Sequence, residues 1–125
     1  MDKISIIVPV YNEEEAIKIF YDKITEVSAR IEAEFEFIFV NDGSKDKTLD
    51  IVKEYAIQDS RVRFVSFSRN FGKEAAMYAG LQASEGDYVA IMDVDLQDPP
   101  DLLPEMYNTL LEKKYDCVAT KRQTR

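Results

Sequence analysis

The 125-residue sequence has no histidine, no tryptophan and a single cysteine, Cys117. Without histidine, the usual zinc sites, histidine-based catalytic triads and histidine proton shuttles are excluded. One cysteine cannot form an internal disulfide bond, and Cys117 lies in an apolar, strand-like run where a small buried side chain is expected. Zinc chemistry and histidine-dependent catalysis are therefore not among the functions that this sequence predicts.

Long apolar runs and an excess of positive charge are also missing. The longest apolar run, residues 4–10, is far too short to span a membrane, and no signal-peptide features flank it. We therefore expect this chain to have no transmembrane segment and to be cytoplasmic. The 24 acidic residues outnumber the 16 basic ones, giving a net charge of -8, which disfavours nonspecific nucleic-acid binding. A composition of 46% hydrophobic and 32% charged residues is typical of one soluble domain, here residues 1–125.

Apolar strands alternate with amphipathic helices along the chain. The expected strands are residues 3–10, 35–40, 62–67, 88–92 and 115–120; the expected helices are residues 13–31, one starting near Asp46, 73–84 and about 104–114. Asn12 and Asp46 are the predicted N-caps of the first two helices. This order predicts an α/β fold, a mainly parallel, Rossmann-like sheet with helices on both faces. Ligands of such sheets bind beyond the carboxyl ends of the strands.

Two aspartates, Asp93 and Asp95, follow the expected strand 88–92. Because side chains alternate along a strand, residues two apart point the same way and can converge on one cation. Paired carboxylates suit Mg²⁺ or Mn²⁺, which are often held by one or two acids plus substrate phosphates. Gln97 continues the alternation and could add its amide oxygen. The alternative is an acidic turn or a helix cap, and Asp98, which precedes Pro99, fits that alternative.

Other strand ends carry candidate nucleotide-binding residues. The sequence has neither the glycine-rich dinucleotide fingerprint nor a P-loop. Pro9 and Tyr11 could form a rigid apolar shelf for a base, and Asp42 could accept from the NH groups of uracil or guanine. Glu13 could reach a ribose hydroxyl or simply favour a helix N-terminus. A strand-ending proline and a turn aspartate are the simpler interpretations of Pro9 and Asp42.

Cationic residues follow two of the strands. Arg69 and Lys73 flank a loop that runs into a helix, which makes a natural anion site or else an exposed linker. Arg122 and Arg125 lie in a basic segment that is either a frayed tail or the start of a phosphate-binding loop.

Four motifs together resemble a known family. They are IVPVYNEE (7–14), VNDGS (40–44), SRNFGKEA (68–75) and MDVDLQDPP (92–100). In this order and spacing they resemble the family-two glycosyltransferases of the A-type fold. The last two motifs are most similar to the polyprenyl-phosphate glycosyltransferases that act on bactoprenol or dolichol phosphate.

This resemblance implies a function and a set of site residues. Pro9, Tyr11, Glu13, Asp42 and Asp93 would contact the nucleotide of a sugar donor, preferably a UDP-sugar. The catalytic pair Asp93 and Asp95, with Gln97, would bind Mg²⁺ or Mn²⁺. The sugar would pass with inversion to a polyprenyl phosphate at the cytoplasmic face of a membrane. The acceptor phosphate would be oriented by Arg122 and Arg125, or by Arg69 and Lys73.

The family's catalytic domain continues beyond the expected fifth strand, so we expect this chain to be a donor-binding half with little or no transfer activity alone. Two alternatives remain. A receiver-like signalling domain has a similar size, although it needs an aspartate after the third strand, where this sequence has Ser66-Phe67-Ser68. A catalytically silent nucleotide-binding module would carry the same motifs.

Overall fold

The computed structural model of the chain describes residues 1–95 and residue 104. Its elements are β1 (Lys3–Val10), α1 (Ile17–Ser28), β2 (Glu34–Asn41), α2 (Thr48–Gln58), β3 (Val62–Ser66), α3 (Lys73–Ala83) and β4 (Tyr88–Ile91). The strands form one sheet in the order β3-β2-β1-β4, and every neighbouring pair is parallel. The predicted fold class is therefore confirmed. Apart from Pro104, the expected helix 104–114 and strand 115–120 lie outside the described residues.

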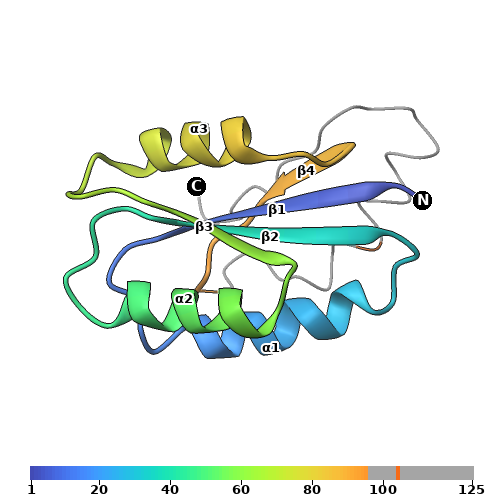
Figure 1. Ribbon diagram of the computed structural model, residues 1–125, viewed down its shortest axis with the longest axis horizontal. Coiled ribbons are helices and arrows are strands. Elements are labelled where there is room, and N and C mark those ends of the chain that lie inside the picture. Colours follow the sequence, from blue (N-terminus) through green and yellow to red (C-terminus); the bar gives the residue numbers. More distant parts are fainter. Residues whose placement is uncertain (96–103, 105–125) are drawn as a thin grey trace, which may run out of the picture.

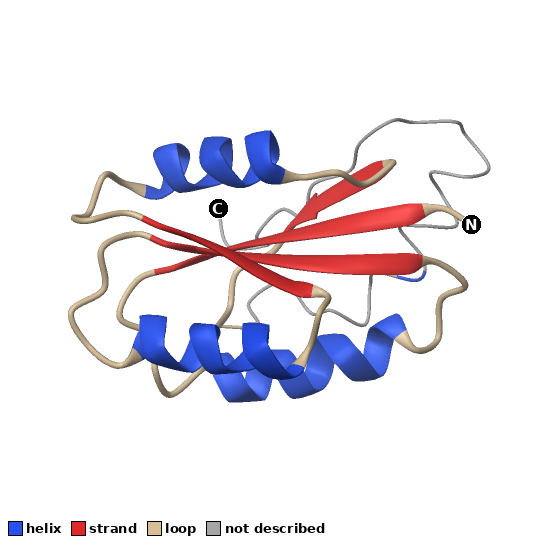
Figure 2. Cartoon of the chain, viewed as in Figure 1, coloured by secondary structure: helices blue, strands red, loops and turns tan. Residues whose placement is uncertain are grey.

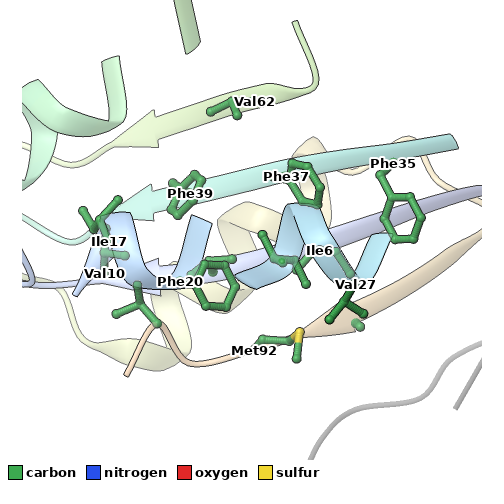
Figure 3. Close-up of a cluster of buried hydrophobic side chains, with 14 of the residues drawn as sticks. Ile6, Val10, Ile17, Phe20, Val27, Phe35, Phe37, Phe39, Val62 and Met92 are labelled. Carbon is green, nitrogen blue, oxygen red and sulfur yellow. The ribbon is translucent and has the colours of Figure 1, made fainter. Parts of the chain in front are cut away.

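Helices cover both faces of the sheet, with α1 and α2 on one side and α3 on the other (Figures 1 and 2). The larger core lies between the sheet and the α1–α2 layer (Figure 3). Phe20 of α1 meets Phe39 of β2 edge to face, with ring centroids 6.2 Å apart. Fully burying such a side chain contributes about 1.5–3 kcal/mol. The aromatic residues of β2 therefore hold the helical layer to the sheet.

The smaller core, between the sheet and α3, is built from Ile7, Ile38, Val40 and Ala76. Gly80 brings α3 unusually close to the strands, because a Cβ atom at this position would lie 2.4 Å from Cγ2 of Ile7. Small residues thus set the distance between α3 and β1.

The predicted start of the first helix is wrong. The chain enters α1 at Ile17 rather than residue 13, and Asn12 has a φ of 52° instead of capping the helix. The amides before α1 are bonded to the loop before α2 and to the first residue of that helix: the N–H of Asn12 donates to Ser44 Oγ at 2.9 Å, and that of Glu13 to Thr48 Oγ1 at 2.8 Å. Residues 11–16 consequently form a loop at the carboxyl edge of the sheet.

The predicted cap at Asp46 is displaced by one residue, because the N-cap of α2 is Lys47, which makes no side-chain cap hydrogen bond. Asp46 lies just before it, and its Oδ1 accepts a hydrogen bond from the backbone N–H of Thr48, the first residue of α2, at 2.9 Å. Among the described residues, no helix has the length and apolar character needed to cross a bilayer.

Candidate functional site

The sheet has a topological switch point between β1 and β4. From β1 the chain moves through α1 and α2 to β2 and β3, and then returns through α3, on the opposite face, to β4 on the other side of β1 (Figure 1). The connections after β1 and those leading to β4 diverge to opposite faces, which opens a crevice where parallel sheets commonly bind ligands. A pocket of about 170 Å³ lies there, and its described lining residues are Pro9, Val10, Tyr11, Glu13, Asp42, Lys73, Asp93, Val94 and Asp95.

Most of the candidate residues inferred from the sequence meet in this pocket. Its lining contains Pro9, Tyr11, Glu13, Asp42, Lys73, Asp93 and Asp95. Arg69 is not among the lining residues; its guanidinium lies 4.1 Å from the centroid of the Phe71 ring. Gln97, Arg122 and Arg125 lie outside the described residues.

One notable lining residue, Val94, is not among those predicted from the sequence. It separates the two aspartates and is only 2% exposed. Strand-like alternation, the same signal that paired Asp93 with Asp95, would have turned the side chain between them inward. The burial of Val94 anchors the segment that carries both carboxylates.

The two aspartates differ in exposure. Asp93 is 13% exposed and forms an ion pair with Lys73, whose Nζ lies 2.6 Å from Oδ1 of Asp93. Asp95 is exposed. Just before them, the N–H of Met92 donates to the carbonyl of Ile7 at 2.9 Å, which extends the β1–β4 pairing by one residue. Lys73 is the first residue of α3, so this ion pair joins α3 to the end of β4.

Negative charge dominates the pocket. Glu13 shares it with Asp93 and Asp95, and among the described lining residues Lys73 is the only cation. Burial raises the pKa of Glu13 above its usual value of 4.5, and repulsion from Asp95, Asp93 and Asp46 raises it further. The pocket therefore favours a bound cation.

The donor set fits a hard divalent ion. All the candidate ligand atoms on Asp93 and Asp95 are carboxylate oxygens, which suit Mg²⁺ or Mn²⁺. The described residues contain no group of three or more histidine, cysteine, aspartate or glutamate side chains able to hold a metal by themselves. This part of the chain would thus hold such an ion together with oxygen ligands from elsewhere, such as phosphates of a bound nucleotide.

The carboxylate of Asp42 is bound within the protein. Asp42 is 5% exposed, and both carboxylate oxygens accept hydrogen bonds from residues 70–72, the loop that precedes α3. The sequence predicts Asp42 only as a base contact or a turn residue. Its partners lie 28–30 residues away in the chain, and no local pattern indicates them.

Comparison with known proteins identifies the family. The family model described as glycosyl transferase family 2 matches residues 5–125. A bactoprenol glucosyl transferase of Shigella phage SfX is 48% identical over 126 residues; the match covers 98% of this chain but only 40% of the relative.

Solved structures agree with this assignment. A mannosyltransferase from Pyrobaculum calidifontis, in complex with GDP-Man and Mn²⁺, aligns with a TM-score of 0.73 and 27% identity, over 87% of this chain and 32% of its own. Glucosyl-3-phosphoglycerate synthase from Mycobacterium tuberculosis, in complex with UDP, aligns with a TM-score of 0.65 and 30% identity, over 88% of this chain and 40% of its own. The sheet is thus that of the glycosyltransferase A-type fold, and the receiver-like alternative has no support. The chain belongs to glycosyl transferase family 2.

Proposed function

We propose that residues 1–125 form the donor-binding domain of a glycosyltransferase that passes a sugar from a nucleotide sugar to a polyprenyl phosphate. The observation that carries this proposal is the pocket at the switch point, whose lining brings two aspartates and a lysine together with the Pro9–Tyr11 segment. Membership of glycosyl transferase family 2 supports the reaction class. The relative named bactoprenol glucosyl transferase supports the lipid acceptor, and with it a location at the cytoplasmic face of a membrane.

The β1 side of the pocket suits the nucleoside. Pro9 is half-buried, and Tyr11 is 44% exposed, so an aromatic face is open to a planar base. Glu13 could accept from a ribose hydroxyl, and Asp42 lines the same wall. A UDP-sugar is our preferred donor. One structural neighbour contains GDP-Man and another contains UDP, so the fold accommodates either base.

The β4 side suits the diphosphate. Asp93 and Asp95, with Gln97, would hold Mg²⁺ or Mn²⁺, and the ammonium group of Lys73 lies at the same edge. When bound, such an ion supplies Lewis-acid stabilisation of the charge that develops on a departing nucleoside diphosphate. Lys73 adds a fixed positive charge that does not depend on the metal.

The chemical step needs no histidine. A phosphate oxygen of the acceptor attacks the anomeric carbon, and the bond from that carbon to the diphosphate breaks with its electron pair leaving on the nucleoside diphosphate. A phosphate monoester has a second pKa of about 6, so its oxygen is already largely ionised at neutral pH. Attack opposite the leaving group inverts the anomeric centre. Arg122 and Arg125, or Arg69, would orient the acceptor phosphate.

Calorimetry of the 125-residue chain with UDP-glucose and GDP-mannose, with and without Mn²⁺, tests this proposal. We expect binding of at least one donor, strengthened by Mn²⁺ and abolished in Asp95→Asn. Asp50→Asn is the matched control, because Asp50 is an exposed acid on α2 outside the pocket lining. A donor affinity that is the same with and without Mn²⁺, or unchanged in a folded Asp95→Asn variant, would overturn the metal-dependent site.

A further inference from the structure

The carboxylate of Asp42 crosslinks the end of β2 to the loop before α3. Oδ1 accepts from the N–H of Phe71 at 2.7 Å, and Oδ2 accepts from the N–H of Gly72 at 3.1 Å. The side-chain amide of Asn70 donates to Oδ2 at 3.2 Å and lies 3.3 Å from the backbone carbonyl oxygen of Asp42. An ionised carboxylate offers about four acceptor positions, and three are used here. Asp42 is therefore bound to the loop before any ligand arrives.

The two backbones are also in direct contact. Gly43, with a φ of 73°, lies so close to the loop that a Cβ atom on it would be 2.2 Å from the carbonyl carbon of Arg69 and 2.4 Å from the backbone nitrogen of Asn70. Only glycine fits this approach. Because of this contact and the hydrogen bonds of Asp42, the turn after β2 and the loop before α3 form one unit.

This unit ends at Lys73. Gly72, whose N–H is held by Asp42, immediately precedes Lys73, and its carbonyl accepts the N–H of Ala76 at 3.1 Å in the first turn of α3. The ammonium group of Lys73 then reaches Asp93 at 2.6 Å. A continuous series of contacts thus runs from Asp42 through the loop backbone and Lys73 to the acidic pair beyond β4.

We propose that Asp42 is a positioning residue for the diphosphate end of the pocket: by holding residues 70–72 it sets where the ammonium group of Lys73 meets the diphosphate opposite Asp93. This role rests on the proposed function and is separate from any contact between Asp42 and the base. The two roles make different predictions for a ligand that has phosphates but no base.

Pyrophosphate with Mn²⁺ is such a ligand, and its affinity for the 125-residue chain can be measured by calorimetry well below the melting temperature. We expect Asp42→Asn to weaken it about tenfold, because an amide placed against two backbone N–H groups leaves one of them without an acceptor. Ser44→Ala is the matched control, because Ser44 lies in the same turn but bonds to Asn12. Its pyrophosphate affinity should stay within about twofold of wild type.

A double-mutant cycle separates positioning from a general loss of stability. If Asp42 acts through Lys73, Asp42→Asn should have almost no further effect on pyrophosphate affinity in a Lys73→Met background. If Asp42→Asn does not fold, Asn70→Ala replaces it, since it removes an exposed donor to the same carboxylate. We then expect a loss of about threefold.

The inference is overturned if these variants bind pyrophosphate as tightly as wild type while nucleotide-sugar affinity falls, because Asp42 would then contact only the base. It is also overturned if the double variant loses pyrophosphate affinity by the product of the fold-losses of Asp42→Asn and Lys73→Met, because the two residues would then act independently. A wild-type chain that binds neither pyrophosphate nor a nucleotide sugar with Mn²⁺ would instead overturn the proposed function itself.

Discussion

At the scale of single residues, the proposed divalent ion would compete with Lys73 for the carboxylate of Asp93. The ammonium group of Lys73 lies 2.6 Å from Asp93, in a pocket where Glu13 and Asp95 add further negative charge. Lys73 therefore partly neutralises the acidic pair when no metal is bound. Once a donor binds, the same ammonium group should stabilise the diphosphate. Removing Lys73 should therefore raise the affinity for the metal alone and lower the affinity for the donor.

We predict that Lys73→Met binds Mn²⁺ alone up to about fivefold more tightly than wild type, because a half-exposed ion pair is worth about 0–1 kcal/mol. The same variant should bind a nucleotide sugar with Mn²⁺ more weakly. Titration followed by Mn²⁺ electron paramagnetic resonance, together with calorimetry for the donor, measures both. Lys53→Met, which removes an exposed lysine of α2, should change neither the affinity for Mn²⁺ alone nor the affinity for the nucleotide sugar. Weaker binding of Mn²⁺ alone by Lys73→Met would show that the ion pair does not oppose the metal.

The candidate site shows which residues a sequence can indicate. The alternation around Asp93 and Asp95 is a local signal, and the parallel fold brings the ends of β1 and β4 together, so their convergence on one pocket could be predicted. The crosslink that Asp42 makes to residues 70–72 could not be predicted from the sequence. It depends on how closely two loops approach, which Gly43 permits but does not specify.

At the scale of elements, α3 depends on one glycine. A helix gains about 1 kcal/mol when glycine is replaced by alanine, but a Cβ atom on Gly80 would lie 2.4 Å from the buried side chain of Ile7. Overpacking of this kind costs about 1–3 kcal/mol. We therefore predict that Gly80→Ala lowers the free energy of unfolding, measured by urea denaturation. Gln82→Ala, on the exposed side of α3, should leave it nearly unchanged, and a stabilised Gly80→Ala variant would contradict the close packing.

Asp59, which follows α2, joins that helix to α1 and to the start of β3. It accepts hydrogen bonds from the hydroxyl of Tyr21 at 2.6 Å and from the guanidinium of Arg61 at 2.9 and 3.0 Å. The bonds from Arg61, helped by Tyr21 and opposed by burial, lower the pKa of Asp59 from 3.8 to about 2. Between these values the unfolded chain binds more protons at this position, so stability rises with pH across this window.

We predict that Asp59→Asn lowers the free energy of unfolding at pH 7 by about 2 kcal/mol. The difference from wild type should shrink as the pH falls from about 4 towards about 2, because the wild-type carboxylate then becomes protonated. Urea denaturation at several pH values measures this. Glu54→Gln, an exposed acid on α2, serves as the control. A difference that stays constant over this range would show that the charge of Asp59 is not what stabilises the fold.

The boundaries of the elements were predicted less well than their order. Residues 13–15 are three consecutive glutamates, which favour a helix N-terminus, yet the helix begins only at Ile17. The amides of residues 12–14 bond instead to side chains of the loop before α2 and of Thr48, the first residue of α2. Helix propensity was overridden by contacts between segments far apart in sequence.

At the scale of the whole molecule, the pocket lies at the carboxyl end of the sheet, whereas a buried carboxylate that stabilises the fold lies near the amino end. Glu36, 3% exposed, lies near the amino end of β2, opposite Ser5 of β1. Its carboxylate accepts from the hydroxyl of Ser5, from the N–H of Glu85 at 2.6 Å and from Arg63 at 2.7 Å. Burial alone would raise the pKa of Glu36, but these hydrogen bonds, with the charge of Lys3, hold it below its usual value. One carboxylate therefore ties three strands to the segment that leads into β4.

This centre lies about five residues, or about 16 Å, along β1 from the residues that line the pocket. Changes more than about 10 Å apart with no shared partners usually act independently. We therefore predict that Glu36→Gln lowers the free energy of unfolding by about 2–3 kcal/mol, because it weakens charge-assisted hydrogen bonds that are largely shielded from water. Donor affinity, measured by calorimetry where the variant is fully folded, should stay within about twofold of wild type. Glu34→Gln, an exposed acid on the same strand, should alter neither quantity. If Glu36→Gln remained folded but lost donor binding, the amino end of the sheet would have to be coupled to the pocket, and the two ends could not be treated as separate.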